Sequence, residues 1–209
     1  MSLLHTDFEK GFLNFEDLNT DPRLQFSAWL DEYMQYTVND NVATTFSSID
    51  QEGFPSSRIV YLRDYPSNGF VFFTNYKSNK GIEVWRNNKA SLLFYWPELE
   101  RQVRIWGYVE KVDEKLSDEY FKTRPRGSQA GAWISAQSQE IKDRESLEQE
   151  HASFLKSAGS EQIARPDFWG GFRLIPCKFE FWQGRANRLH DRFLYLKNGT
   201  DWDIKRLAP

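Results

Sequence analysis

The stretch RIVYLRDYPSNGFVFFTN, residues 58–75, decides the fold class. Two runs rich in β-branched and aromatic residues, 58–63 and 70–75, flank YPSNG (65–69), whose composition is typical of a turn. So short a connection predicts that the two strands pair antiparallel. The same pattern continues on both sides, and we expect further strands at residues 42–49, 91–96, 102–112, 172–183, 191–196 and 202–207.

Helical spacing surrounds these strands. Asp21-Pro22 has an N-cap residue followed by proline, and predicts a helix with Phe26, Trp29 and Leu30 on one face. We expect further helices from Ser78, from Ser117 with a continuation over 128–138, and over 143–156 with Leu147, His151, Phe154 and Leu155 on one stripe. We interpret Trp169-Gly170-Gly171 as a tight turn under a packed ring.

Strands and helices do not alternate regularly, which argues against a Rossmann or TIM architecture. Tight turns between strands instead predict a mainly β (α+β) fold, an antiparallel barrel with peripheral helices. Residues 1–20 are polar with scattered aromatics and form an arm, and residues 21–209 form one domain. Aromatic residues make up 16% of the chain, which favours a β-rich core or a stacking surface for a flat ligand.

Composition excludes several classes of function. The 209 residues carry a net charge of −3, which argues against nucleic-acid binding driven by bulk charge. Cys177 is the single cysteine, so no intrachain disulfide forms; we expect it in the core, and with three scattered histidines we expect no metal site. No apolar run is long enough to cross a bilayer, and the N-terminus lacks the apolar region of a signal peptide, so we expect a cytoplasmic protein.

Cations beside short polar side chains suggest a first phosphate site. SNK (78–80) lies where a helix begins, and a helix N-terminus attracts anions through its free N–H groups. SSR (56–58) lies at a strand entrance. For the segment 78–80 alone, an N-cap followed by a surface lysine is the plainer explanation.

A second group, Tyr120, Arg124, Arg126 and Ser128, offers two guanidinium forks and two hydroxyls, a set that suits another phosphate. A charged helix end is the plainer explanation for the same residues.

A third group lies in RLHDR (188–192). If this segment enters a strand, Arg188, His190 and Arg192 share one face and need an anion or an electron-rich ring opposite. A solvated barrel rim with an Asp191 salt bridge is the alternative.

Seven segments between residues 58 and 209 resemble the pyridoxamine 5′-phosphate oxidase (pyridoxine 5′-phosphate oxidase) family, and we expect the resemblance to extend from about residue 20 to the C-terminus. They are RIVYLR (58–63), GFVFFTNYKSNKG (69–81), RQVRIWGYVEKV (101–112), SDEYFKTRPRGSQAGAWISAQS (117–138), WGGFRLIP (169–176), FEFWQGRANRLHDRFLY (179–195) and RLAP (206–209).

The resemblance implies an FMN-binding split β-barrel that forms a homodimer, with FMN in the cleft between subunits and a C-terminal segment that serves dimerisation and the active site. Cofactor-binding positions of the family match Arg58, Ile59, Val60, Tyr61, Leu62, Arg63, Phe73, Thr74, Asn79, Lys80, Gln102, Gln137, Ser138, Trp182 and Arg192. Substrate-binding positions match Arg63, Tyr120, Arg124, Ser128, Arg188, Leu189 and His190. Arg188 and His190 are the expected catalytic pair, and the arm is expected to act as a lid.

The implied reaction oxidises C4′ of pyridoxamine or pyridoxine 5′-phosphate to the aldehyde, pyridoxal 5′-phosphate, with hydride transfer to FMN. Dioxygen is then reduced to hydrogen peroxide, and the amine substrate releases ammonia. The expected partners are therefore these small molecules and a second copy of the chain, without nucleic acid or membrane. The alternatives are a related FMN oxidase, for example of phenazine biosynthesis, and a non-catalytic protein that binds FMN or pyridoxal 5′-phosphate.

Four positions depart from the family pattern. Arg63 stands where the family usually has Lys, and Asn79 where an Arg often helps to bind the FMN phosphate. In the arm, His5 and Phe8 stand where an Arg and a Tyr commonly reach over the substrate. We expect weaker retention of FMN from the missing cation at position 79.

Overall fold

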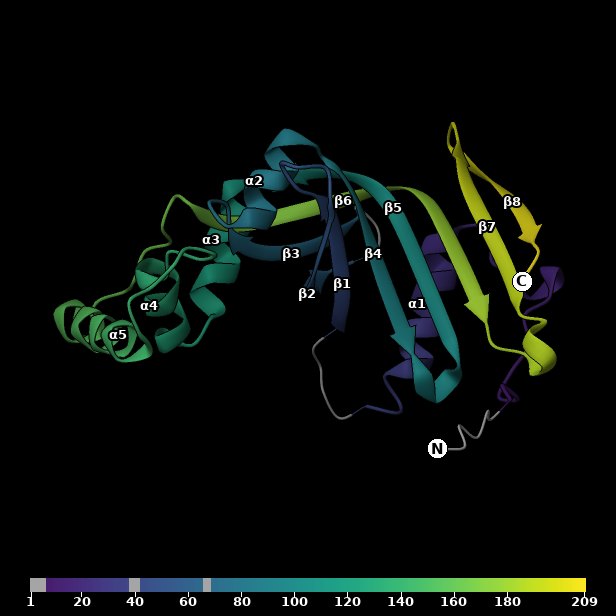
Figure 1. Cartoon of the computed structure of the whole chain (residues 1–209), viewed down its shortest axis with the longest axis horizontal. Helices are drawn as coiled ribbons and strands as arrows, with labels where there is room; N and C mark the ends of the chain where they lie inside the picture. Colours follow the sequence, from purple (N-terminus) through teal and green to yellow (C-terminus); the bar gives the residue numbers. More distant parts are fainter. Residues whose placement is uncertain (1–6, 38–41, 66–68) are drawn as a thin grey trace.

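The computed structural model describes residues 7–37, 42–65 and 69–209. Within them, strands pair antiparallel in the order β3-β2-β1-β4-β5-β6-β7-β8, and β3 also pairs with β6. This extra pairing closes six strands into a barrel, which β7 and β8 extend on one side (Figure 1). The expected antiparallel barrel is confirmed. The strands are β1 Val42–Ile49, β2 Pro55–Asp64, β3 Phe70–Asn75, β4 Lys89–Trp96, β5 Arg101–Lys111, β6 Trp169–Gln183, β7 Asp191–Asn198 and β8 Asp201–Leu207.

Strand β6 holds the two parts of the sheet together. Residues 169–174 pair with β3, while residues 178–183 pair with β7. The expected turn at Trp169-Gly170-Gly171 is therefore wrong, because these residues begin β6. The two glycines allow other side chains to lie close to the backbone of β6. A Cβ at Gly170, for example, would collide with the Tyr76 hydroxyl.

Five α-helices lie in the described residues: α1 Pro22–Tyr33, α2 Asn79–Arg86, α3 Glu114–Thr123, α4 Arg126–Ile134 and α5 Arg144–Ala158. Asp21 caps α1 by accepting the Arg23 N–H at 2.9 Å, and Ser78 caps α2, as expected. Helix α3 begins earlier than expected because Asp113 supplies its cap. Helices α3, α4 and α5 gather at the end of the barrel away from the β7–β8 hairpin (Figure 1).

Aromatic rings fill the barrel and pack α1 against it. Phe26 of α1 is fully buried, and its ring centroid lies 5.1 Å from that of Phe70 and 4.9 Å from that of Phe94. The abundance of aromatic residues thus serves the core first. Cys177 in β6 is half-buried, so it lies at the edge of the interior rather than within it.

Residues 7–14 of the arm lie along β6 and the start of β7. The Leu13 N–H donates to Asp191 Oδ2 at 3.1 Å, and the Phe8 ring lies 5.6 Å from Trp182 and 5.7 Å from His190. Phe8 therefore covers the segment that the resemblance assigns to the active site, whereas His5 lies outside the described residues. No described helix is long and apolar enough to cross a membrane.

Candidate functional site

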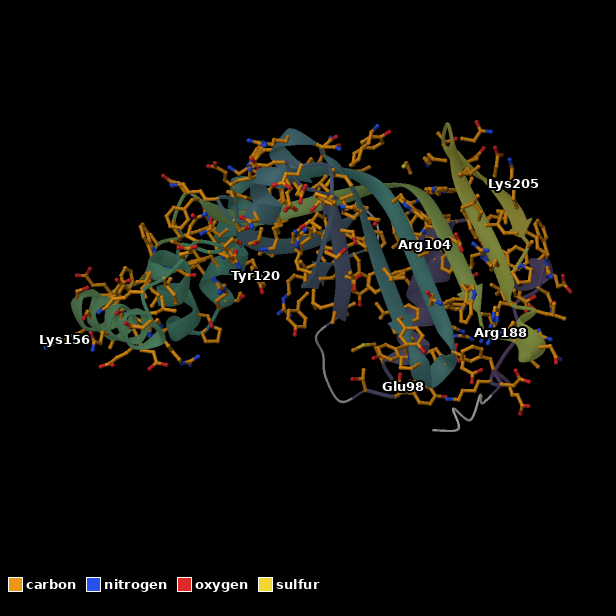
Figure 2. All side chains as sticks on the ribbon, in the orientation of Figure 1. Glu98, Arg104, Tyr120, Lys156, Arg188 and Lys205 are labelled. Carbon is orange, nitrogen blue, oxygen red and sulfur yellow. The ribbon has the colours of Figure 1, made fainter. Side chains whose placement is uncertain are left out.

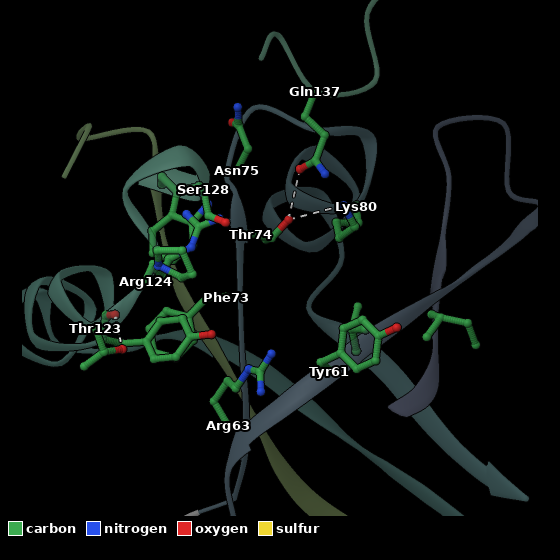
Figure 3. Close-up of a pocket in the computed structure, with 15 residues that line it drawn as sticks. Tyr61, Arg63, Phe73, Thr74, Asn75, Lys80, Thr123, Arg124, Ser128 and Gln137 are labelled. Atoms are coloured by element: carbon green, nitrogen blue, oxygen red, sulfur yellow. Dashed lines mark hydrogen bonds between the residues drawn. The ribbon is translucent and has the colours of Figure 1, made fainter. Parts of the chain in front are cut away.

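A pocket of about 580 Å³ opens between β2, β3 and the helices α3 and α4 (Figure 3). It brings together most of the predicted site residues: Ile59, Val60, Tyr61, Arg63, Phe73, Thr74, Lys80, Tyr120, Arg124, Ser128 and Gln137. Alternation along β2 explains part of this set, because Ile59 and Tyr61 face outward while Leu62 is buried in the core. Leu62 is not among the residues that line the pocket.

One end of the pocket is built around Lys80, in the first turn of α2. Its Nζ lies 3.2 Å from Thr74 Oγ1 and 3.3 Å from Ser78 Oγ, and Thr74 Oγ1 in turn donates to Gln137 Oε1 at 3.2 Å. Burial, together with the nearby Arg58, lowers the pKa of Lys80 to about 8. The ammonium form is thus poorly compensated, and an anion at this end would restore its usual basicity.

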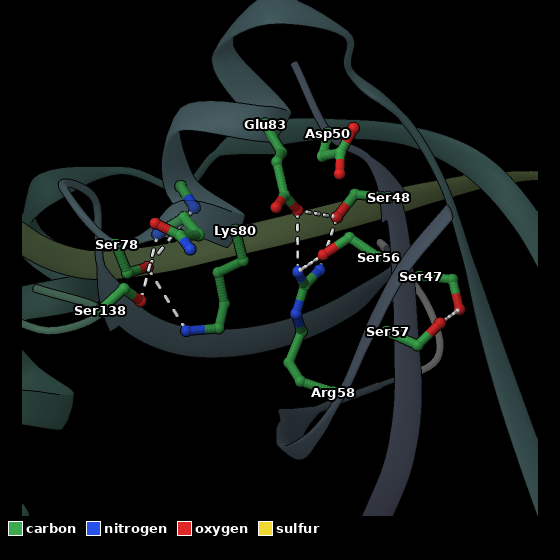
Figure 4. A network of polar contacts seen from close by, with 12 residues as sticks. Ser47, Ser48, Asp50, Ser56, Ser57, Arg58, Ser78, Lys80, Glu83 and Ser138 are labelled. Carbon is green, nitrogen blue, oxygen red and sulfur yellow. Dashed lines mark hydrogen bonds and ion pairs between the residues drawn. The ribbon is translucent and has the colours of Figure 1, made fainter. Parts of the chain in front are cut away.

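Arg58 lies beside this lysine and is held by a buried acid (Figure 4). Its Nη2 lies 2.8 Å from Glu83 Oε2, and Ser48 Oγ donates to the same oxygen at 2.5 Å. Arg58 also donates to Ser48 and Ser56. Two cations thus face one carboxylate, which leaves a net charge of +1 at this end. Sequence reasoning missed Glu83, which lies on α2 with no local signal for this contact.

Two further predicted residues, Asn79 and Ser138, meet at the same end. The Asn79 backbone N–H donates to Ser138 Oγ at 3.3 Å. Ser138 has a φ of 75°, a conformation that few non-glycine residues adopt, so the loop after α4 is turned sharply toward α2.

The other end of the pocket is an aromatic stack with a cation at each side. The Phe73 ring lies 4.0 Å from Tyr120 and 5.7 Å from Trp169. The Arg63 guanidinium carbon lies 5.9 Å from the centre of the Tyr120 ring, and that of Arg124 lies 4.5 Å from the Trp169 ring. Sequence reasoning missed Trp169 because it read its segment as a turn.

Arg124 gives the clearest indication of an anion site. Its Nη1 is buried and has no hydrogen-bond partner among the described residues. Burial also lowers the pKa of its guanidinium. Helix α4 begins at Arg126, and the residue before it, Pro125, has no side chain that can cap the helix. Ser128 therefore lies in a first turn whose backbone N–H groups have no side-chain cap. A buried donor of this kind is costly unless an anion completes it.

Arg126 does not belong to this group, contrary to the expectation from its position. It turns away and donates to the carbonyl oxygens of Ala158, Gly159 and Glu161 at 3.2, 2.7 and 2.6 Å. Those carbonyls mark the end of α5, where the helix dipole is negative and a cation binds well.

The remaining predicted residues lie elsewhere on the same chain. Trp182 pairs with Gln102 across β5–β6 and with Arg192 across β6–β7, and none of the three lines the pocket. Figure 2 places Arg188 and Tyr120 at different ends of the molecule. One chain therefore carries two separate groups of predicted residues: a first half-site at the pocket, and a second half-site of Gln102, Trp182, Arg188, Leu189, His190 and Arg192.

His190 is the titratable centre of the second half-site. Its ring lies 4.6 Å from Trp182, and its Nδ1 accepts the Arg185 backbone N–H at 3.1 Å. Its neutral form therefore carries the proton on Nε2. Desolvation and the neighbouring Arg188 and Arg192 lower the pKa of His190, which favours this neutral donor form.

The expected shared strand face of Arg188, His190 and Arg192 is wrong. Strand β7 begins only at Asp191, and Arg188 ends a short 3₁₀ turn with a φ of 61°. Arg192 is on the strand, where its Nη2 lies 2.8 Å from the buried Glu180 carboxylate. The reason is that a period of two holds only where the chain is extended.

Comparison with known proteins agrees with this geometry. Residues 30–155 match the family model described as pyridoxamine 5′-phosphate oxidase, and residues 169–209 match the pyridoxine 5′-phosphate oxidase C-terminal dimerisation region. A pyridoxine/pyridoxamine 5′-phosphate oxidase of Bordetella pertussis is 49% identical over 210 residues, 100% of this chain and 99% of the relative. One of Nostoc punctiforme is 48% identical over 208 residues, 99% and 97% of the two chains.

Solved structures share the fold. PhzG from Burkholderia lata, in complex with tetrahydrophenazine-1-carboxylic acid, superposes with a TM-score of 0.88 at 29% identity, over 98% of this chain and 100% of that chain. An FMN-binding protein of Nostoc punctiforme gives a TM-score of 0.71 at 15% identity, over 92% and 100%.

The matches confirm the resemblance seen in the sequence, the oxidoreductase class and FMN as the cofactor, and the dimerisation region indicates a homodimer. Two family models and relatives that span its whole length agree: the chain belongs to the pyridoxamine 5′-phosphate oxidase family.

Proposed function

We propose that this chain oxidises pyridoxamine 5′-phosphate and pyridoxine 5′-phosphate to pyridoxal 5′-phosphate, with FMN as cofactor and dioxygen as final electron acceptor. The observation that carries the proposal is the pair of cationic ends on one aromatic-lined pocket, Lys80 with Arg58 at one and Arg124 with Arg63 at the other. FMN and the substrate are both flat and both carry a phosphate, so a site that binds the two together needs two cationic ends. The buried, unpartnered Nη1 of Arg124 marks the second.

The residues present fit FMN. Lys80 and Arg58 supply a net positive charge for its phosphate, and Thr74, Ser78 and the start of α2 add further donors. Backbone and outward side chains of residues 59–61 line the adjoining wall. FMN, when bound, supplies the two-electron chemistry that no side chain can.

The chain itself supplies position and charge. Arg124, Tyr120 and Ser128 bind the substrate phosphate, and Arg63 reaches toward it across the Tyr120 ring. For the alcohol, two electrons and two protons leave C4′ and its oxygen and reduce one dioxygen to hydrogen peroxide. The amine loses the same two electrons and two protons, and one water then releases ammonia from the resulting imine.

Assembly of the full site requires a second copy. We propose that the second half-site of one subunit faces the pocket of the other, so that Arg188 and His190 close over the substrate ring while Trp182 and Arg192 approach the cofactor. The separation of the two half-sites within one chain supports this arrangement. Neutral His190, with its proton on Nε2, then donates a hydrogen bond to the oxygen or nitrogen at C4′ rather than removing a proton from it.

A phenazine-type oxidase is the second candidate, because PhzG shares the fold with a TM-score of 0.88. Arg124 favours the phosphorylated substrate, since a molecule without phosphate would leave its Nη1 buried and unpaired.

Anaerobic mixing of the FMN-loaded protein with pyridoxine 5′-phosphate tests the proposal. Loss of the visible flavin absorption, its recovery on admission of air, and formation of the aldehyde and hydrogen peroxide are expected. Unphosphorylated pyridoxine is the matched control and should leave the absorption unchanged. An unchanged absorption with both phosphorylated substrates would refute the proposal.

A further inference from the structure

The first turn of α4 is tied to α5 by a histidine that the proposed reaction does not use. His151 Nε2 lies 2.8 Å from the carbonyl oxygen of Gly127. A carbonyl only accepts, so His151 carries a proton on Nε2 and donates it. Gly127 directly precedes Ser128, which lines the pocket. A hydrogen bond from α5 thus reaches the backbone next to a proposed phosphate ligand.

A second set of hydrogen bonds joins the two helices, with the donor on α4 and the acceptors at the end of α5. Arg126, on the other side of Gly127, donates to three carbonyls at the end of α5. Two hydrogen-bonding groups therefore join residues 126–127 to α5: the His151 side chain donates to the Gly127 carbonyl, and the Arg126 side chain donates to carbonyls at the end of α5. This matters because glycine in a helix is conformationally loose, and a Cβ at Gly127 would meet only ordinary van der Waals contact with the His151 ring, so packing does not fix it.

Helix α5 does not depend on His151 for its own place. Phe154 and Leu155 pack against the buried cluster of Phe121, Ala132, Ile163 and Trp169. The Phe154 ring also stacks on Trp133 of α4, with centroids 6.1 Å apart. Loss of the imidazole should leave these contacts intact and release only the first turn of α4.

We propose that His151 is a positioning residue for the substrate phosphate: through Gly127 it fixes the first turn of α4, and with it Ser128 and the preceding Arg124. The inference rests on the proposed function, because it assumes that this anion site holds the phosphate. It assigns a role to α5, a helix without a fully buried residue and with no residue that lines the pocket.

The test compares His151→Ala and His151→Gln with Gln149→Ala. Among the described residues, Gln149 bonds to Glu145 on the same exposed face, so its variant changes α5 without touching α4. We expect His151→Ala to raise KM for pyridoxine 5′-phosphate about three- to tenfold, the value of one hydrogen bond, with kcat within about twofold of wild type. FMN affinity should not change, and the glutamine amide should recover part of the loss.

A readout independent of turnover separates this inference from the proposed function. Hydrogen exchange of the backbone amides of residues 126–130 should be faster in His151→Ala than in wild type or Gln149→Ala. The Kd of inorganic phosphate for the FMN-loaded protein should rise in parallel with KM. If wild type fails to oxidise pyridoxine 5′-phosphate, the proposed function fails, and exchange and phosphate affinity still decide the role of His151.

Unchanged exchange in His151→Ala would overturn the inference. So would faster exchange with unchanged phosphate affinity, because the first turn would then move without consequence for the anion. Equal changes in Gln149→Ala would also overturn it, since general loosening of α5 would suffice.

Discussion

The pKa of Lys80 leads to a sharp prediction for cofactor binding. Burial and Arg58 lower it to about 8 from an ordinary value of 10.5, so half of the free protein carries a neutral Lys80 at pH 8. A bound phosphate favours the ammonium form. Binding should therefore take up a proton above pH 8, and the Kd of FMN should rise about fivefold between pH 8 and pH 9 as the protonated fraction falls from about one half to about one eleventh.

The same shift fixes the sign for the stability of the cofactor-free protein. Because the folded pKa lies below the unfolded one, the unfolded chain binds more protons between pH 8 and 10.5. Burial of this lysine lowers the free energy of unfolding by its full amount below pH 8, and the loss shrinks as the pH rises from 8 to 10.5. High pH thus stabilises the cofactor-free protein and weakens the binding of FMN.

Quenching of FMN fluorescence, titrated at half-unit steps from pH 7.5 to 9, gives the Kd. Lys80→Arg stays charged throughout, so its Kd should be flat over this range, and Lys80→Met should bind weakly at every pH. Riboflavin lacks the phosphate and should show no rise with wild type. A flat Kd for FMN in wild type, or a parallel rise in Lys80→Arg, would refute the placement of the phosphate at Lys80.

Three further predictions concern the other end of the pocket and the core. Arg124→Ala should raise KM for pyridoxine 5′-phosphate by about 10- to 100-fold in steady-state assays, because a charge-assisted bond is lost, while the Kd of FMN stays constant. Trp169→Leu removes the ring that Arg124 covers at 4.5 Å and should raise the same KM about two- to tenfold, whereas an unchanged KM would argue against the stack. Phe26→Ala should lower the free energy of unfolding by about 3–5 kcal/mol in urea titrations, since its fully buried ring meets those of Phe70 and Phe94.

The barrel could be predicted from sequence because its signals are local. Alternating side chains and short turns along 58–75 and 198–199 determine which strands pair with their neighbours. The closing pair β3–β6 joins residues about a hundred positions apart and has no such signal. The turn predicted at Trp169-Gly170-Gly171 is wrong for the same reason: the glycines make room for distant residues, Gly170 for Tyr76 and Gly171 for Val112 and Phe73.

The candidate site divides in the same way. Lys80 follows from a cation at a helix start, and Arg124 follows from a guanidinium close to the hydroxyls of Tyr120 and Ser128; both patterns are visible along the chain. The contacts of Glu83 with Arg58 and of Trp169 with Arg124 could not be foreseen, because only the fold brings these residues together. In the second half-site, a strand face is predicted for Arg188, His190 and Arg192, but a left-handed turn at Arg188 breaks that periodicity. The distance of this half-site from the pocket within one chain had no sequence signal at all.

A heterodimer of two defective subunits tests most directly whether each active site is shared between copies. Arg124→Ala damages only the first half-site and Arg188→Ala only the second, and co-expression with two different affinity tags isolates the mixed dimer. One of its two sites then combines two intact halves and the other combines both defects. At a substrate concentration well below the raised KM of Arg124→Ala, the account predicts about half of the wild-type rate of pyridoxine 5′-phosphate oxidation, although both parent homodimers are nearly inactive at that concentration. A mixed dimer no more active than its parents would contradict it.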